Sequence, residues 1–354
     1  MSTPTVYDVA ERAGVSIATV SRVYRNPDSV RGPTRERVLA SARELGYVPS
    51  GSARGLASRS TGVLGLCYPD FHDSESDSAP GADPGEVALY SDEVIRGMER
   101  AARRHGYALL IAASHADEAG TRLTEVAGRV DGLAVLAQAV PEEALEMVAR
   151  RVPVVLLAGE PYDGLDHVKV ANFDGQLQIT RHLLSAHRLR RLAFVGGPAD
   201  SPDGEARFLG YQAAHLEAGL PLPAGPDVRG DLTQAAGRKA VEELFGAYGD
   251  GPRPQGLVFA NDQMAVGALH ALEARGVDVP GDLAVTGFDG IALSRLVRPT
   301  LTTVRQPMSQ LGVEAVELLV ARLSGRERSP EARLLPVTPV WRESCGCATD
   351  AAAP

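Results

Sequence analysis

Several features are scarce in this chain of 354 residues, and each absence excludes a class of protein. Only three cysteines occur, Cys67, Cys345 and Cys347, which is too few for a disulfide-stabilised secreted scaffold. No hydrophobic run approaches the ~20 residues that a membrane-spanning helix needs, and the N-terminus lacks the charged and then apolar layout of a signal peptide. We therefore expect a cytoplasmic protein with reduced thiols, whose 44% hydrophobic residues can fill the cores of two or three domains.

Positive charge is also scarce, because 36 basic residues stand against 45 acidic ones and give a net charge of −9. The balance changes along the chain. Residues 1–60 hold nine arginines and five acids, a net +4, so the remainder holds 27 basic and 40 acidic residues, a net −13. This asymmetry is typical of a small unit that contacts phosphates, joined to an acidic body that does not touch nucleic acid.

Residues 1–47 show the pattern of three short helices around one small core. The first has apolar residues at helical spacing over 6–13 and should end at Gly14. A second should begin after the cap residue Ser16, and a third should cover 34–45. Because the second helix carries small, polar and basic side chains just after a glycine turn, the pair is typical of a helix-turn-helix that reads a DNA groove. A tight helical hairpin without such a role would give the same pattern.

The second helix should bury Val20 and Val23, which leaves four residues on its other faces to meet DNA: Ile17, Ala18, Ser21 and Arg22. Segment 48–60 then predicts a linker with a short hinge helix that is marginal when isolated. Leu56 is a large aliphatic side chain beside arginines, which suits a wedge between base pairs in the minor groove. A plain linker is the alternative.

After residue 60, short apolar strands alternate with helical stretches in two series. This alternation predicts parallel sheets covered by helices on both faces, and two series predict two lobes. The predicted fold is therefore an all-α head with a two-lobed α/β body. The expected strands are 63–67, 108–112, 132–136 and 154–157 in the first series, and 192–195, 256–260 and 283–286 in the second.

The predicted boundaries follow from these patterns. The head is 1–47, the hinge 48–60, the body 61–345 and a frayed tail 346–354. Within the body, the first lobe takes 61–169 and 300–327, and the second takes 170–299 and 328–345, so that a strand near 334–341 closes the second lobe. Residues 71–87 are rich in Asp, Ser, Pro and Gly and should be a solvated loop, or alternatively a lid over a cleft.

Polar residues cluster after strands of the second series. Asn261, Asp262 and Asp289 follow predicted strands, and Arg207 lies near the start of a helix after another. Because parallel sheets bind ligands beyond the carboxyl ends of their strands, these side chains should converge on a cleft. Together they could hold the hydroxyls of a sugar-like ligand. Taken singly, Asp262 could be a helix cap, and Arg207 or Asp289 could be structural ion-pair partners.

The residues give little support for catalysis. We find no Ser-His-Asp order, no metal-ligand cluster and no phosphate-binding loop. His182 and His187 are five residues apart, so we expect them to face solvent or lie at a helix end, not to share a helix face. Cys345 and Cys347 alone are too close for a complete metal site. We therefore expect no enzyme, no metal and no cofactor.

Five motifs stand in chain order in the head and hinge: Tyr7-Asp8-Val9-Ala10, Ala13-Gly14-Val15-Ser16, Thr19-Val20-Ser21-Arg22-Val23, Gly46-Tyr47-x-Pro49 and Ala53-x-x-Leu56. They resemble the lactose-repressor (LacI/GalR) family of bacterial transcriptional regulators, and the resemblance continues through nearly the whole chain. In the body, R-x-x-G-[YW], A-N-D-x-x-A-x-G and G-[YF]-D occur in the family's order. The resemblance implies a body like the periplasmic binding proteins.

The resemblance implies a homodimeric repressor that binds a palindromic operator and responds to a small effector, a sugar or sugar derivative, held between the lobes. Ile17, Ala18 and Arg22 would face base edges, and Leu56 would open the centre of the site. The implied DNA-binding residues are Tyr7, Ser16, Ile17, Ala18, Thr19, Ser21, Arg22, Asn26, Ala53 and Leu56. The implied effector-binding residues are Tyr90, Arg207, Asn261, Asp289 and Gln306.

The chain departs from the family pattern at Ala158, where many relatives have an aspartate. One effector contact is then missing or supplied by Glu160, so neither the identity of the effector nor the direction of its effect follows from the sequence. The alternative function is a solute-binding protein of the same two-lobed architecture without a DNA-binding role. A signal peptide would favour that alternative, and the head would have no explanation in it.

Overall fold

The computed structural model describes residues 4–48, 60–69, 89–114, 118–136, 140–249, 251–325 and 329–348. The chain divides into two compact units, Met1–Gly62 and Val63–Pro354. The predicted hinge residues Ala53 and Leu56, and the predicted loop 71–87, lie outside the described residues. No helix of the described residues is long and apolar enough to cross a membrane.

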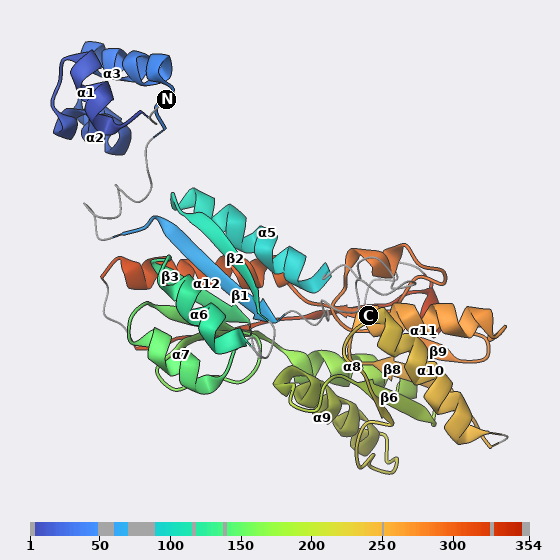
Figure 1. The fold of residues 1–354 in the computed structure, drawn as a ribbon. Helices are drawn as coiled ribbons and strands as arrows, with labels where there is room; N and C mark the ends of the chain where they lie inside the picture. Colours follow the sequence, from blue (N-terminus) through green and yellow to red (C-terminus); the bar gives the residue numbers. More distant parts are fainter. Residues whose placement is uncertain are drawn as a thin grey trace. The chain divides into compact units, whose positions relative to one another are not determined.

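The first unit contains the three predicted helices and one short 3-10 turn (Figure 1). Thr5 caps the first helix, because its backbone N–H and its hydroxyl both donate to the Asp8 carboxylate at 2.7 Å. That helix ends at Gly14, whose φ of +63° is a left-handed conformation that glycine adopts without a side-chain clash. The elements are α1 (Val6–Ala13), α2 (Ile17–Arg25), η1 (Pro27–Ser29) and α3 (Gly32–Leu45).

The start of α3 lies at Gly32, two residues before the predicted Thr34, because Pro33 is tolerated in the first turn of a helix. Arg37 of α3 ties the end of α1 to the unit, since its Nε donates to the carbonyl oxygen of Ala13 at 2.9 Å. The three helices enclose one small core, whose buried members are Val9, Ala10, Ala13, Val20, Val23, Val38 and Ala42.

The second unit contains two lobes, each built on a parallel sheet between helices, as predicted (Figure 1). The sheet of the first lobe has the order β11-β5-β4-β3-β1-β2, with every neighbouring pair parallel. One core packs this sheet against α5 and α12, and a second packs it against α6 and α7. The elements are β1 (Val63–Pro69), α5 (Leu89–Arg104), β2 (Ala108–Ser114), α6 (Ala119–Ala127), β3 (Gly132–Leu136), α7 (Glu142–Ala149), β4 (Val154–Leu157), β5 (Asp166–Val170), α12 (Met308–Leu323) and β11 (Ala332–Leu335).

The sheet of the second lobe has the order β7-β6-β8-β9, again all parallel. One large core fills this lobe, with Phe194, Tyr211 and Phe259 fully buried in it. Helices α8 and α9 pack together, as do α10 and α11. The elements are α8 (Asn172–Ser185), β6 (Leu192–Gly196), α9 (Pro202–Glu217), β7 (Val228–Arg229), α10 (Gln234–Tyr248), β8 (Gly256–Phe259), α11 (Asp262–Ala274), β9 (Ala284–Thr286) and η4 (Ala292–Arg295).

The connections between the lobes correct one prediction. The predicted return into the first lobe after residue 300 is confirmed, because β10 (Thr303–Arg305) leads directly into α12. The assignment of residues 328–345 to the second lobe is wrong for β11, which pairs with β5 in the first sheet. The chain then runs back through β12 (Thr338–Val340), antiparallel to β10, and ends in the second lobe at η5 (Glu343–Cys345). The antiparallel pair β10 and β12 therefore belongs to the connection between the lobes.

The strand β5 is absent from the sequence prediction because its first residues are polar. Asp166 and His167 are nevertheless buried, each 1% exposed. Arg322 of α12 donates two hydrogen bonds to the Asp166 carboxylate at 2.7 and 3.0 Å, and His167 Nε2 lies 2.8 Å from the carbonyl oxygen of Ala158. These specific partners, rather than apolar alternation, allow the strand to be buried.

Candidate functional site

The helix α2 presents a mostly small and polar surface outside its buried side. Ser16 caps it, accepting a hydrogen bond from the backbone N–H of Thr19 at 3.2 Å. Val20 and Val23 are buried as predicted, while Ala18 and Arg22 are exposed and Ile17 is 38% exposed. The start of this helix is therefore a surface that a DNA groove could receive.

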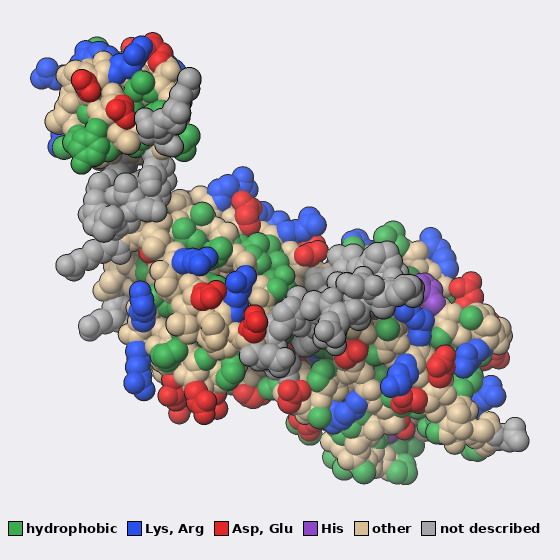
Figure 2. Space-filling view, viewed as in Figure 1, with side chains coloured by type: hydrophobic (Ala, Val, Ile, Leu, Met, Phe, Trp, Pro, Cys, Tyr) green, Lys and Arg blue, Asp and Glu red, His purple; other side chains and the backbone are tan. Residues whose placement is uncertain are grey.

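The other predicted head residues lie around this surface with different exposure. Tyr7, on α1, is 67% exposed, and Asn26, which ends α2, is exposed as well. Thr19 and Ser21 are half-buried. On the face shown in Figure 2, hydrophobic side chains stand among charged ones at the surface of this unit. Ser16, Ile17, Ala18, Arg22, Tyr7 and Asn26 are thus accessible, while Thr19 and Ser21 are accessible only in part.

The guanidinium of Arg22 is exposed on α2 and is available to an external partner. Within residues 4–48, the ion pairs join Arg12 to Glu44 and Arg35 to Asp28, and neither includes Arg22. The helix also contains no acidic residue. An exposed guanidinium can donate two parallel hydrogen bonds to a guanine edge in the major groove. The body contrasts with this surface, because acidic side chains gather near α7 in the view of Figure 2.

In the body, a buried polar group surrounds Arg207 of α9. The guanidinium Nε donates to the side-chain oxygen of Asn172 at 2.9 Å, and Nη1 donates to the carbonyl oxygen of Ala260 at 2.5 Å. Nη1 also lies 3.6 Å from Asp289 Oδ1, and the guanidinium carbon lies 4.0 Å from the centre of the Phe288 ring. These contacts come from the start of α8, the residue after β8 and the segment after β9, and together they fix the plane of the guanidinium.

Asp289 holds an unusual backbone conformation beside this cation. Its φ is +122°, which a non-glycine residue seldom adopts and which the surrounding contacts must stabilise. The side-chain amide of Gln306 donates to Asp289 Oδ1 at 2.6 Å. Burial raises the pKa of Asp289 to about 6, although Arg207 and Gln306 favour the ionised form. Asp289 is therefore a carboxylate held ready to accept hydrogen bonds, at a cost in desolvation.

Tyr90 and Asp203 complete the group. Tyr90 is half-buried at the start of α5, and burial, followed by the charges of Asp203 and Asp289, raises the pKa of its hydroxyl. The carboxylate of Asp203 accepts a hydrogen bond from the side-chain amide of Asn172 at 2.8 Å. Four of the five predicted effector-binding residues are thus in one neighbourhood: Tyr90, Arg207, Asp289 and Gln306. Asp203 and Asn172 were missed because each lies in the first turn of a helix and carries the signal of a helix start only.

The fifth predicted residue, Asn261, has its side chain engaged elsewhere. Its oxygen accepts a hydrogen bond from Met264 N at 3.0 Å and caps α11, while its amide donates to the carbonyl oxygen of Leu232 at 2.8 Å. The reading of Asp262 as the helix cap is therefore wrong. Asp262 instead accepts hydrogen bonds from the backbone of Gly290 and Ile291, at 2.8 and 3.0 Å, and holds the segment that carries Asp289.

Ala158, where the chain departs from the family pattern, lies beside a cavity at the edge of the first lobe. Ala158 is buried with a φ of +61°, and Glu160 beside it is exposed and pairs with Lys169 at 3.7 Å. A cavity of about 280 Å³ lies here, lined by residues of both lobes, including Leu136, Ala158, Glu160, Tyr162, Asp200 and Pro202. Glu160 therefore lines a cavity next to the group around Arg207, whose own members are not part of that lining.

Two family models match the chain. The one described as bacterial regulatory proteins, lacI family, matches residues 5–50, and the one described as a periplasmic binding protein-like domain matches residues 180–345. Among relatives, catabolite control protein A of Priestia megaterium is 35% identical over 89% of this chain and 91% of its own length. The HTH-type transcriptional repressor CytR of Escherichia coli K12 is 33% identical over 94% of this chain and 93% of its own length.

Solved structures agree with these matches. A complex of the transcriptional regulator CelR with cellobiose has a TM-score of 0.69 and 30% identity, and covers 96% of this chain and 99% of that one. The lac repressor dimer bound to operator and the anti-inducer ONPF has a TM-score of 0.80 and 26% identity, and covers 97% of this chain and 99% of that one. The chain therefore belongs to the lacI family of bacterial regulatory proteins, as a DNA-binding transcriptional regulator with a periplasmic binding protein-like body.

Proposed function

We propose that this regulator is a homodimeric repressor whose affinity for a palindromic operator changes when a small polar effector binds its body. The observation that carries the proposal is that one chain holds both an exposed Arg22, outside the ion pairs of the head, and a buried polar group around Arg207 in the body. The relatives are transcriptional regulators, and we assign no catalytic step. A protein with this task acts at the chromosome, which supports a cytoplasmic location.

At the operator, each protomer would read one half-site with α2. Arg22 suits a guanine, because its fork of donors matches the O6 and N7 acceptors. Ile17 and Ala18 offer apolar contacts that suit thymine methyl groups. Two identical heads require two half-sites about one helical turn apart, and this geometry supports a palindromic site.

At the body, we assign effector binding to Tyr90, Arg207, Asp289 and Gln306. A carboxylate, a guanidinium, an amide and a phenol offer donors and acceptors in several directions, which suits a ligand with several hydroxyl groups. Two relatives support the carbohydrate class: the CelR structure contains cellobiose, and the ribose operon repressor of Escherichia coli K12 is 32% identical to this chain. We therefore propose a sugar or sugar derivative as the effector.

The linkage between the two sites must be reciprocal. An effector that binds one state of the body 100-fold more tightly shifts the equilibrium by about 2.7 kcal/mol. A shift of this size changes operator affinity by about two orders of magnitude, which is enough to release a repressor from its site. A corepressor would raise operator affinity by the same argument, and an operator-binding titration with and without effector gives the direction of the change.

The test combines footprinting with a ligand screen. Purified protein should protect a palindromic site, and a thermal-shift screen against sugars and nucleobases should identify the effector that alters this protection. Asp289→Ala should abolish the effector response and leave operator binding intact, whereas Glu273→Ala, an exposed acid on α11, should change neither. Weak, sequence-independent binding with a steep salt dependence would contradict the operator assignment. An unchanged response in Asp289→Ala would contradict the effector assignment.

A further inference from the structure

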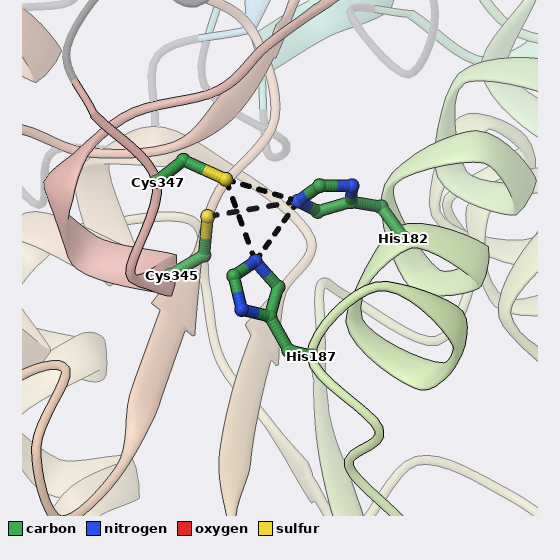
Figure 3. A group of neighbouring side chains, drawn as sticks. All are labelled: His182, His187, Cys345 and Cys347. Atoms are coloured by element: carbon green, nitrogen blue, oxygen red, sulfur yellow. Dashed lines mark hydrogen bonds between the residues drawn. The ribbon is translucent and has the colours of Figure 1, made fainter. Parts of the chain in front are cut away.

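The second lobe brings together four side chains that the regulatory function does not use. They are His182, His187, Cys345 and Cys347, and one ligand atom of each lies within 4.8 Å of the others. Figure 3 shows the Nε2 atoms of both imidazoles and both sulfur atoms converging on one place between α8 and the C-terminal segment. Two nitrogens and two sulfurs are a donor set that zinc takes in proteins.

The local fold explains why the sequence did not predict this group. His182 lies in the last turn of α8, but α8 ends at Ser185, so the five-residue spacing to His187 is not a helical spacing. The chain turns after the helix and brings the two rings within 4.8 Å, centre to centre. The expected helix-end position is confirmed for His182, whereas the statement that the chain has no metal-ligand cluster is wrong for this group. The two cysteines reach the same place from about 160 positions further along the chain, which no local pattern reveals.

The C-terminal segment is shaped to present both sulfurs to the histidines. Cys345 ends η5 and is buried, and Gly346 follows with a φ of +94°, which favours glycine. A β-carbon at Gly346 would lie about 3.5 Å from the His187 ring, so the segment passes directly against that imidazole. Cys347 then turns back toward both rings (Figure 3).

The separations are close to those of a tetrahedral zinc site. His182 Nε2 lies 3.0 Å from His187 Nε2, 3.2 Å from Cys347 Sγ and 4.0 Å from Cys345 Sγ, and His187 Nε2 lies 3.4 Å from Cys347 Sγ. Zinc bonds of about 2.0 Å to nitrogen and about 2.3 Å to sulfur place the ligand atoms about 3.3 to 3.8 Å apart in a tetrahedron. The separations from Cys345 Sγ to the other two ligand atoms, His187 Nε2 and Cys347 Sγ, are within 4.8 Å, so the ligand atoms must draw together by up to about 1 Å to reach these bond lengths.

A bound cation explains the close approach of these two nitrogens and two sulfurs better than hydrogen bonds among them do. Cys347 Sγ faces both ring nitrogens, at 3.2 and 3.4 Å, but a thiol has one proton to donate. The two Nε2 atoms also face each other at 3.0 Å, so at least one imidazole must donate toward the other. A single divalent ion satisfies all four atoms at once. Two thiolates, two neutral imidazoles and one Zn²⁺ form a site of zero net charge, which suits a half-buried position.

The surroundings support such a site. The Trp341 ring stacks on the His182 ring, with centres 3.9 Å apart and an angle of 21° between the planes. The Thr302 hydroxyl can donate its one proton either to Cys345 Sγ, 3.1 Å away, or to the carbonyl oxygen of Arg342, 3.0 Å away. A hydroxyl donor stabilises a thiolate, and a stacked ring fixes the orientation of its imidazole.

We propose that His182, His187, Cys345 and Cys347 bind one zinc ion that fastens the C-terminal segment to α8. Four protein ligands leave no open position, so the site is structural and not catalytic. Binding forms two Zn–N and two Zn–S bonds and releases the two thiol protons to solvent, with no change in oxidation state. Helix α8 begins at Asn172, which contacts Arg207 and Asp203, so the ion would stabilise the helix that supports the proposed effector site.

The test uses full-length protein that has been stripped with a chelator under reducing conditions. Titration with Co²⁺ should give one equivalent of a tetrahedral visible spectrum with a sulfur-to-cobalt charge-transfer band, and Zn²⁺ should displace it. The single tryptophan of the chain, Trp341, should report the same endpoint through its fluorescence, because it stacks on His182. Absence of the charge-transfer band, or a stoichiometry well below one, would overturn the proposal.

Ligand variants make the assignment specific. Cys347→Ser and His187→Gln should each weaken zinc binding about 100-fold or more, since each removes one of four bonds. The matched controls are Cys67→Ser, a buried thiol in the first lobe, and His270→Gln, an exposed histidine on α11, and both should bind zinc as the parent does. Parent-like zinc binding in both ligand variants would overturn the proposal.

A second measurement does not depend on how the variants fold. In the parent protein, Zn²⁺ should protect Cys347 from alkylation, as read by mass spectrometry of its peptide, and a chelator should restore the reaction. Equal alkylation with and without Zn²⁺ would count against the site. So would a mass lower by two hydrogens under reducing conditions, because it would show a Cys345–Cys347 disulfide in place of two thiolate ligands.

Discussion

The backbone N–H of Gly159, which follows strand β4 of the first lobe, donates a hydrogen bond of 3.1 Å to Oδ1 of Asp203 in helix α9 of the second lobe. The same oxygen accepts the hydrogen bond from Asn172, whose own oxygen receives Arg207. One carboxylate therefore connects the position where the chain departs from its family, beside Ala158, to the polar group proposed to bind the effector. Movement of one lobe against the other must break or remake this bond.

Asp203→Ala should loosen this connection. The variant leaves two donors without their acceptor, so we expect the body to lose about 1–3 kcal/mol of unfolding free energy and its effector affinity to fall roughly tenfold. Urea unfolding and an effector titration measure the two effects. Glu205→Ala, an exposed acid two residues along the same helix, is the control and should change neither quantity. Equal losses of stability and effector affinity in both variants would mean that the negative charge of this helical turn causes them, and not the hydrogen bond between the lobes.

The raised pKa of Asp289 predicts a dependence of stability on pH. The usual value for an aspartate is near 3.8, and in the folded protein it is about 6. The folded state therefore binds the proton more tightly than the unfolded state, and stability falls as pH rises from about 4 to about 6. Ionised Asp289 then costs up to about 3 kcal/mol above pH 6, by the conversion of pKa shifts to free energy.

Asp289→Asn should remove this cost. We expect the variant to be more stable than the parent at pH 7.5, and the advantage to shrink or vanish at pH 4.5, where the parent carboxyl is also neutral. Urea unfolding at both pH values measures the difference. Asp282→Asn serves as the control, because its carboxyl is exposed. An advantage of the same size at both pH values would show that it does not arise from the proton.

The sequence predicted the elements whose signals are local and failed where the answer depends on distant partners. The head helices were predicted because Ser16 and Gly14 mark their ends. The strand β5 was missed, since the charge of Asp166 is compensated by Arg322, 156 positions away. The strand β11 was given to the wrong lobe because the sequence of a short strand does not specify which sheet it joins.

Among the site residues, too, those with a local signal were predicted and those that depend on distant partners were missed. The closeness of Arg207 and Asp289 was predicted because parallel strands place following residues at one edge, and Gln306 was implied only by the family resemblance. The engagement of Asn261 with Leu232 depends on a loop conformation that the sequence does not show. The group of two histidines and two cysteines was missed because the end of α8 decides where His187 lies. In each case the chemistry of the residues was readable, and their three-dimensional neighbours were not.

Two glycines of α10 offer a matched test of helix packing. A β-carbon at Gly237 would clash with the backbone of Met264 in α11, whereas a β-carbon at Gly246 would meet nothing within 4 Å. Gly237→Ala should therefore destabilise the body by about 1–3 kcal/mol, because the two helices must separate. Gly246→Ala should stabilise it by about 0.5–1 kcal/mol through helix propensity. Thermal unfolding of the two variants should shift in opposite directions, and shifts of the same sign would contradict the close packing of α10 on α11.

Arg22→Ala should reduce operator affinity far more than affinity for unrelated DNA. If Arg22 donates to a guanine edge, its loss should weaken operator binding by about 1–3 kcal/mol, or roughly 10- to 100-fold. Arg12→Ala is the matched control, because it removes the same charge from a guanidinium that is already engaged with Glu44, and the loss of such an exposed ion pair costs little stability. Fluorescence anisotropy at one salt concentration, with operator and scrambled duplexes of equal length, separates the two cases. A uniform loss on both duplexes would place Arg22 on the phosphate backbone, and sequence reading would then fall to the apolar contacts of Ile17 and Ala18.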